Sequence, residues 1–225
     1  MTSKKQVIII GTGETAALAY EYFTADSDFQ VAGFAVEKKF YNQKNFCGLP
    51  VCCFEDVEKC YDPEKFSAFV ALGSGELNRQ RTRLYHLTKA KGYSLVSYIS
   101  SHAFVWHNVV IGDNCFIMEQ NVLQPFTKVG NNVIMWSGNH LGHRSQIGDN
   151  CFVSSHVVIS GFCQIGENCF IGVNTSIGDG ISVGEDNFIA MGTVITKNTA
   201  PNSIMRGTPA VAHKISAKKF CQVEE

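Results

Sequence analysis

Two histidines in the stretch GNHLGHRSQIGDN (residues 138–150) are the first candidates for chemistry in this sequence. His140 and His143 stand three residues apart, and Arg144 follows at once. Two imidazoles could contribute to a metal site, whereas one imidazole could act as a general base at neutral pH. No cysteine or carboxylate is placed to complete a zinc shell, so we favour the base and expect no metal requirement. A surface histidine without a chemical role is the alternative.

A glycine-rich turn near the start of the chain is the second candidate. The sequence GTGETA (11–16) follows an apolar run and opens a helical pattern, so backbone N–H groups of Gly11, Thr12 and Gly13 could bind phosphate. Glu37 ends a second apolar run and could bind a ribose or a base. Residues 1–98 amount to half of a two-lobed dinucleotide fold, which favours a nucleotide diphosphate carried by a sugar. The alternative is a turn that only packs helix on strand.

The elements that carry this turn alternate between short apolar runs and helical patterns. This alternation predicts a small parallel α/β sheet with helices on its faces over residues 1–98. The expected strands are Gln6–Ile10, Phe29–Val36, Phe66–Leu72 and Tyr93–Ile99, and the expected helices lie within 11–23, at Phe54–Cys60 and at Glu76–Lys91.

From residue 99 the sequence has a strict period of six. Seventeen positions out of seventeen, taken every sixth residue from Ile99 to Ile195, are aliphatic. The pairs IG, VG, IG, IG and VG at 111, 129, 147, 165 and 183 add a period of eighteen. These periods predict a parallel β-helix of hexapeptide repeats, a prism with three sides to each coil, over residues 99–200, followed by a tail over 201–225. We expect glycine, Asn and Asp to adopt left-handed backbone conformations at its corners.

The six-residue period also predicts where side chains point. The aliphatic position faces the interior, and so does the position four residues later. Four of the nine cysteines occupy that second position, and we expect them to be reduced filler residues: Cys115, Cys151, Cys163 and Cys169. His143 stands two residues after an aliphatic position and His140 five after one, so both are expected to face outward. Asn121 and Asn139, one coil apart, are expected to stack in a structural amide ladder.

The overall composition narrows the possible partners. Nineteen Lys and Arg residues against twenty Asp and Glu leave a formal charge of −1 without a basic block, so nucleic acid and anionic membrane are poor candidates. The first apolar run stops after four residues, too short for a signal-peptide core, and no stretch approaches the roughly 18 apolar residues of a spanning helix. We therefore expect a soluble, cytoplasmic protein. The cysteines include no C-x-x-C pair, which argues against a zinc ribbon.

Together these features resemble a family of bacterial sugar acyltransferases, which includes the N-acetyltransferases of nucleotide-linked amino sugars and the sialic acid O-acetyltransferases. The resemblance covers essentially the whole chain. It rests on GTGETA (11–16), GFAVEKK (33–39), ALGSGELNRQR (71–81), SYISSHAFV (97–105), the unit from His143 to Gly148, and RGTPA (206–210). It implies a Rossmann-like nucleotide-sugar domain followed by a left-handed parallel β-helix, in a homotrimer that binds acetyl-CoA between neighbouring prisms.

The resemblance also implies roles for particular residues. His143 matches the catalytic base, and Gly161, one coil further on, matches a backbone N–H that contacts the thioester carbonyl. Val173 and Met191 match backbone contacts to the pantetheine arm. The other candidates for the nucleotide sugar are Gly11, Thr12, Gly13, Glu37, Gly73, Ser74, His140 and Glu119. Arg206 and the lysines at 214, 218 and 219 could bind the phosphates of CoA, and the alternative is a solvated tail.

Two positions depart from the family pattern. Some members carry a glutamate directly after the base, where this chain has Arg144. Another acid, such as Glu119 or one from a neighbouring subunit, would then assist His143, or the histidine works without one. The second strand often ends in two aspartates, where this chain has Val36 and Glu37, and the base of the nucleotide is left open.

The expected activity is acetyl-CoA-dependent N-acetylation of a nucleotide-linked amino sugar, by resemblance a 4-amino-4,6-dideoxyhexose used in polysaccharide biosynthesis. The sugar amine, deprotonated by His143, attacks the thioester directly. No acyl-enzyme is expected, because Cys151 and Cys163 point inward. The alternatives are O-acetylation, as in the sialic acid enzymes, and a β-helix binding module without catalysis.

Overall fold

The computed structural model describes residues 5–224, and the contacts within the chain divide it into two compact units. The first unit is Met1–Gly73 with Arg81–Tyr98, and the second is Ser74–Gln80 with Ile99–Glu225; residues 1–4 and 225 lie outside the described part. Ser74–Gln80 therefore packs with the second unit although it precedes residue 98 in the chain.

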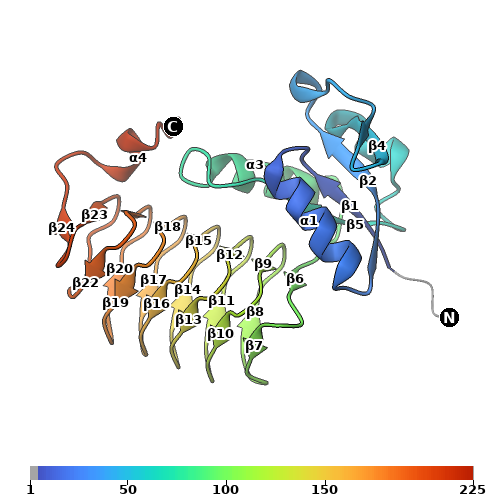
Figure 1. The fold of residues 1–225 in the computed structure, drawn as a ribbon. Helices are drawn as coiled ribbons and strands as arrows, with labels where there is room; N and C mark the ends of the chain where they lie inside the picture. Colours follow the sequence, from blue (N-terminus) through green and yellow to red (C-terminus); the bar gives the residue numbers. More distant parts are fainter. Residues whose placement is uncertain (1–4, 225) are drawn as a thin grey trace. The chain divides into compact units, whose positions relative to one another are not determined.

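The first unit is a parallel sheet with helices (Figure 1). The strands lie in the order β3-β4-β2-β1-β5, and all pairs are parallel except β3 with β4. The chain places β2 on one side of β1 and β5 on the other, and such a reversal opens a crevice at the carboxyl ends of the strands. The bounds are β1 Lys5–Ile10, α1 Glu14–Ala25, β2 Phe29–Val36, η1 Lys38–Phe40, β3 Asn45–Phe46, β4 Leu49–Cys53, η2 Phe54–Asp56, α2 Val57–Cys60, β5 Ser67–Val70 and α3 Arg79–Ala90.

Burial explains why these segments form the sheet. Val7 to Ile10 of β1 are each 0% exposed, as expected of a central parallel strand covered on both faces. On α1 the buried residues are Ala16, Ala19 and Phe23, whose spacing of three and four places them on one face of the helix.

Two expectations for this half are wrong in detail. The strand expected at Tyr93–Ile99 is reduced to a single parallel bridge between Leu95 and Ala68, with Tyr98–Ile99 pairing elsewhere as β6. The helix expected from residue 76 begins at Arg79, because residues 76, 77 and 78 all have positive φ, between 49° and 69°. The hairpin of β3 and β4 was not predicted, since its strands are short and lack a clear alternation.

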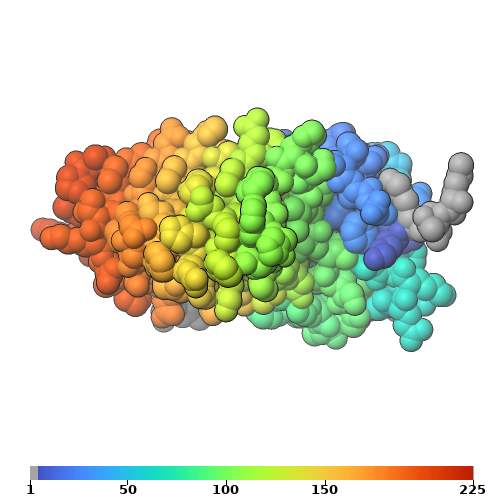
Figure 2. Space-filling view, turned by 90° about the horizontal axis from the view of Figure 1, so that it is seen from below, coloured from blue at the N-terminus to red at the C-terminus, as the bar shows by residue number. Residues whose placement is uncertain are grey.

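The second unit is a parallel β-helix, as the six-residue period predicts (Figure 1). Two-residue strands recur every six residues and pair in parallel with strands one coil away, as Val122–Leu123 pairs with His140–Leu141. They form three sheets, in the orders β22-β19-β16-β13-β10-β7, β20-β17-β14-β11-β8 and β24-β23-β21-β18-β15-β12-β9-β6, in which only β24 is antiparallel to its neighbour. Figure 2 shows the coils from below as successive bands of colour.

The bounds of this unit follow the repeat closely. They are β6 Tyr98–Ile99, β7 Phe104–Val105, β8 Val110–Ile111, β9 Phe116–Ile117, β10 Val122–Leu123, β11 Lys128–Val129, β12 Ile134–Met135, β13 His140–Leu141, β14 Gln146–Ile147, β15 Phe152–Val153, β16 Val158–Ile159, β17 Gln164–Ile165, β18 Phe170–Ile171, β19 Ser176–Ile177, β20 Ser182–Val183, β21 Phe188–Ile189, β22 Val194–Ile195, β23 Ile204–Arg206, β24 Val211–Ala212 and α4 Ala217–Phe220.

The interior of the coils is filled from the two predicted inward positions. The aliphatic residues from Ile117 to Ile195 are at most 4% exposed. The first three of the series are less buried, and Ile99 is 40% exposed, because β6, β7 and β8 are the terminal strands of their sheets. The four predicted filler cysteines are confirmed: each is a free thiol and 0% exposed.

The expected left-handed corners are confirmed for Asn, Asp and some of the glycines, such as Asn150, Asp186 and Gly138. Left-handed residues recur every six positions at the third place after the aliphatic residue, and side chains as large as Phe126 and Arg144 occupy that place. The glycine directly after the aliphatic residue, such as Gly130, does not have a positive φ. A Cβ there would lie 2.8 Å from backbone atoms of the next coil, so this glycine is required by close stacking of the coils.

The amide ladder is also displaced from its expected place. The Nδ2 of Asn121 donates to the carbonyl oxygens of Met118 and Trp136, so Asn121 and Asn139 bond to backbone rather than to each other. The ladder forms one position earlier in other repeats. It joins Asn114, Asn132 and Asn150 through Nδ2–Oδ1 hydrogen bonds of 2.8 and 2.9 Å.

Candidate functional site

His143 lies at a turn of the β-helix, between β13 and β14. Since neighbouring coils are in register at a spacing of 18 residues, the same turn recurs in each coil and its residues form a column. We call Pro125, His143, Gly161 and Asp179 the base column. The backbone of His143 is held on both sides, because its N–H donates to Gln124 Oε1 (2.9 Å) and its carbonyl accepts from the N–H of Phe162 (2.9 Å).

The exposed imidazole of His143 lies over Gly161. A Cβ at Gly161 would be 2.6 Å from Cε1 and 3.0 Å from Nδ1 of the ring, and the Phe162 ring packs against the imidazole edge to face at 4.9 Å. The carbonyl of Gly161 accepts from Gly180 N–H (2.9 Å), whereas its own N–H meets no acceptor within residues 5–224. An exposed imidazole therefore lies beside a residue whose backbone donor is unused, and acyl transfer requires both a proton acceptor and such a donor.

Arg144 is directed toward the preceding coil. Its φ is 59°, and its guanidinium carbon lies 4.6 Å from the ring centroid of Phe126. This cation–π contact accounts for the arginine at the position where some members of the resembled family carry an acid.

One carboxylate of the base column was missed in the sequence. Asp179 Oδ1 lies 3.0 Å from the place that a Cβ at Gly161 would take, and His143 Nδ1 lies at the same distance from that place. The period of eighteen residues could have identified it, because Asp179 follows His143 by two coils and so occupies the same place in the turn.

Other predicted residues lie at a different turn. Glu119, Val173 and Met191 occupy a second column, at the turn between β12 and β13 and its repeats, one side of the prism away from His143. Val173 is 40% exposed and Met191 77%, while Glu119 accepts a hydrogen bond of 2.5 Å from Ser137 Oγ. We call this the second column.

The remaining predicted residues of the β-helix are spread more widely. His140 is half-buried on β13, the side of the prism that joins the two columns. Arg206 is exposed at the end of β23. Cys163 is buried next to the base column, where burial raises the pKa of its thiol and its Sγ donates to Gly178 O (3.1 Å), both of which disfavour a thiolate nucleophile.

The glycine turn of the first unit borders a cavity of about 630 Å³ at the carboxyl ends of the strands. Its lining includes five of the predicted residues: Gly11, Thr12, Gly13, Glu37 and Gly73. Gly11 has φ 126°, and a Cβ there would lie 2.8 Å from Ala71 O, so only glycine fits. Its N–H donates to Ala35 O (2.8 Å), which corrects its expected role as a phosphate donor. Ser74 belongs to the second unit and does not line this cavity.

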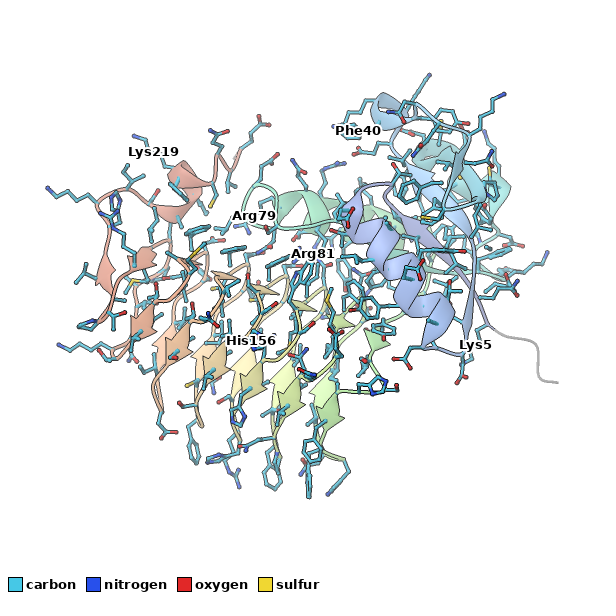
Figure 3. All side chains as sticks on the ribbon, in the orientation of Figure 1. Lys5, Phe40, Arg79, Arg81, His156 and Lys219 are labelled. Carbon is cyan, nitrogen blue, oxygen red and sulfur yellow. The ribbon has the colours of Figure 1, made fainter. Side chains whose placement is uncertain are left out.

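Glu37 contributes a carboxylate to the cavity. Arg83 Nη2 lies 2.7 Å from Glu37 Oε2, and this hydrogen bond holds the pKa of the Glu37 carboxyl below its usual range. Other lining residues follow β2 in a segment without a period and were not predicted from the sequence: Lys39, Phe40, Asn42 and Gln43. Arg81 was not predicted as a site residue either; it is 0% exposed and donates to the carbonyl oxygen of Gly73, which lines the cavity (2.7 Å). Phe40 and Arg81 are labelled in Figure 3.

Two further features of the described residues bear on the class of site. Within residues 5–224, no group of three or more His, Cys, Asp or Glu side chains is arranged to hold a metal ion. Among the helices of the same residues, none has the length and apolar character to cross a membrane.

Family models match the repeat region of the chain. Residues 108–143 and 126–161 match the bacterial transferase hexapeptide (six repeats), and residues 164–197 match the hexapeptide repeat of succinyl-transferase. No curated protein matches the sequence.

Solved structures share the fold over almost the whole chain. A mutant of perosamine N-acetyltransferase from Caulobacter crescentus, in complex with CoA and GDP-perosamine, is 24% identical, with a TM-score of 0.83 over 92% of this chain and 96% of that one. The acetyltransferase domain of PglB from Neisseria gonorrhoeae is 23% identical, with a TM-score of 0.83 over 93% and 100%. WeeI from Acinetobacter baumannii is 18% identical, with a TM-score of 0.63 over 92% and 99%. These structures confirm the predicted fold, a left-handed β-helix of hexapeptide repeats.

Proposed function

We propose that this chain is an acetyl-CoA-dependent N-acetyltransferase that acts on the amino group of a nucleotide-linked amino sugar, and its hexapeptide repeats and fold support this class. The observation that carries this proposal is the exposed imidazole of His143 above the unused N–H of Gly161. An amine acceptor is supported by the matching fold of an N-acetyltransferase bound to CoA and GDP-perosamine. A 4-amino-4,6-dideoxyhexose is the acceptor class that we propose.

The reaction follows from the places of these groups. The nitrogen of the sugar amine attacks the thioester carbon of acetyl-CoA, and the His143 imidazole takes the proton that the amine loses. The Gly161 N–H stabilises the charge that develops on the carbonyl oxygen, which is worth roughly 3–4 kcal/mol for a well-placed donor. The C–S bond then breaks, the proton held by His143 passes to the sulfur so that CoA leaves as the thiol, and the acetyl group remains on the sugar nitrogen.

Direct attack is favoured over an acyl-enzyme. The buried thiols of Cys151 and Cys163 face the interior of the coils, and burial raises the pKa of Cys163. Alignment of the two substrates beside His143 would supply much of the remaining rate enhancement.

A homotrimer is part of the proposal. Val173 and Met191 lie on the second column, whereas His143 and Gly161 lie on the base column, one side of the prism away. A groove lined by both columns therefore needs two copies of the chain, which a closed cyclic assembly supplies. Acetyl-CoA would lie in that groove, and the nucleotide would occupy the cavity lined by Gly13 and Glu37.

A thiol-release assay tests the proposal. The full chain is incubated with acetyl-CoA and UDP-, GDP- or dTDP-linked 4-amino sugars, with the matching 4-hydroxy sugars and free sialic acid as controls. We expect CoA release with at least one amino sugar and none with its hydroxy counterpart. Release only with hydroxyl acceptors would support O-acetylation instead, and no release with any acceptor would leave a binding module.

A further inference from the structure

Two polar side chains of the base column border the empty side-chain position of Gly161. His143 Nδ1 and Asp179 Oδ1 each lie 3.0 Å from the place where a side chain at residue 161 would begin, and glycine leaves that place empty. The His143 backbone is fixed by Gln124 and Phe162, and Asp179 is held on a coil in register with it. The imidazole and the carboxylate therefore face the same small space from two coils.

We infer that Asp179 is the positioning acid for His143. With the substrates bound, its carboxylate would accept a hydrogen bond from the Nδ1–H of the imidazole and leave Nε2 free to take the proton from the acceptor amine. A carboxylate in this place selects the tautomer and stabilises the imidazolium formed during proton transfer. Hydrogen bonds of this kind often shorten when substrate binds. This role rests on the proposed function, since His143 must first be the base.

The neighbouring acids do not fit the role. Asp149 is bonded to Asn131, through its Oδ1 to the backbone N–H (2.7 Å) and through its Oδ2 to the side-chain amide. Glu119 lies on the second column of the same chain. The residue next to the base is Arg144, whose charge lies against Phe126.

The assignment also gives Gly161 a second use. A methyl group at residue 161 would come within 3.0 Å of both polar atoms and would push the ring and the carboxylate apart. Glycine at this position therefore leaves room for His143 and Asp179 to approach each other, in addition to supplying the N–H proposed to bind the thioester carbonyl.

The tautomer of His143 is the direct test. Nitrogen-15 NMR of the full chain, labelled at histidine, shows which ring nitrogen carries the proton, and His143→Asn identifies the signal. At about pH 8.5, where an imidazole is ordinarily neutral, we expect the Nδ1–H form in the native chain. Asp179→Ala should shift His143 toward the Nε2–H form. Glu167→Ala, an exposed acid at the equivalent place of another turn, is the matched control and should leave the signal unchanged.

Kinetics supply the second readout. Asp179→Ala should lower kcat by about tenfold to a hundredfold, part of what a general base contributes, while the KM for acetyl-CoA changes less than about twofold. Asp179→Asn, which keeps an oxygen acceptor without the charge, should lie between Asp179→Ala and the native chain. An unchanged His143 tautomer in Asp179→Ala would overturn the inference, and so would an unchanged kcat in a chain that transfers acetyl groups. If the native chain transfers no acetyl group, the proposed function fails, and the tautomer still decides whether Asp179 orients His143.

Discussion

The base column and the cavity behind Gly11 hold their functional groups in different ways. In the base column, every residue is fixed by a coil that repeats its neighbour, and Gly161 and Asp179 stand in register with His143. The cavity is formed by strand ends together with the segment 39–43, in which Phe40 is 56% exposed. The first region fixes geometry, and the second presents varied polar groups at a surface.

This difference suggests a division of labour. Proton transfer depends on positions held to a fraction of an ångström, and a stack of coils in register provides such positions. Recognition of a nucleotide sugar depends on which polar groups a loop presents, and loops change readily without disturbing the sheet below them. We therefore expect substitutions in the base column to act mainly on kcat, and substitutions in the cavity to act mainly on KM for the nucleotide sugar.

The largest effect is expected from His143→Asn. Loss of the base should lower kcat by about 10²–10⁴-fold while the binding of the nucleotide sugar is retained. Steady-state kinetics and calorimetric titration with the nucleotide sugar separate the two quantities. His86→Asn, an exposed histidine of α3, is the matched control and should behave as the native chain. Full turnover by His143→Asn would contradict the assignment of proton transfer to the base column.

Gly161→Ala should come next. The added Cβ would lie 2.6 Å from Cε1 of His143, so the ring must move and the N–H donor becomes misaligned. We expect a loss of about a hundredfold in kcat, comparable to the loss of one oxyanion donor. Gly192→Ala places a Cβ in open space at another turn, and thermal unfolding of this variant measures what an added methyl group does to the stability of the coils. The φ of 67° at Gly192 adds backbone strain, so this control sets an upper limit on that loss of stability. A kcat within twofold of the native value would show that Gly161 does not supply the donor to the thioester carbonyl.

A moderate effect is expected from Glu37→Ala in the cavity. Loss of a charged acceptor should raise the KM for the nucleotide sugar by about tenfold or more and leave kcat nearly unchanged, as for a charge-assisted hydrogen bond of 1.5–3 kcal/mol. Because the hydrogen bond to Arg83 lowers the pKa of the Glu37 carboxyl, the group stays ionised at lower pH than an ordinary glutamate. The contribution of Glu37 to KM should therefore be constant at neutral and alkaline pH, and be lost only as the pH falls through the lowered pKa. A fall in kcat with unchanged KM would contradict the division.

The smallest effect is expected from Cys163→Ala. The thiol is buried as filler, so activity should stay within about twofold, and the free energy of unfolding should fall by roughly 1 kcal/mol for a small cavity. Turnover and thermal unfolding of the same preparation measure both. Abolished activity in a folded chain would indicate a covalent acyl-cysteine step.

The two regions were also unequally predictable from the sequence. In the β-helix, the six-residue period correctly predicted that four cysteines face the interior and that His143 faces outward, because the coil repeats at a fixed spacing. The same period also predicts that Asp179 occupies the same place in the turn as His143. The two residues are 36 positions apart, so their relation is found only by comparing turns that are two coils apart. The left-handed corners were predicted for Gly, Asn and Asp, and many of them are such residues, but the fold also imposes this conformation on Arg144 and Phe126.

In the first unit, local patterns identified the glycine turn and Glu37 but not the remaining walls of the cavity. Phe40 and Gln43 come from a segment whose path depends on tertiary packing and carries no period. The expected strand at Tyr93–Ile99 forms only a single bridge, at Leu95, for the same reason. An apolar run does not determine how many residues pair with a neighbouring strand.

The transfer of an acetyl group to the amino nitrogen of a nucleotide-linked sugar tests the central claim most directly. The native chain and His143→Asn would each be incubated with acetyl-CoA and the amino sugar that releases CoA, and the product would be examined by mass spectrometry and NMR. We predict one acetyl group on the sugar nitrogen with the native chain, and almost none with His143→Asn over the same time. An acetyl group on a hydroxyl, or equal product from both chains, would contradict the account.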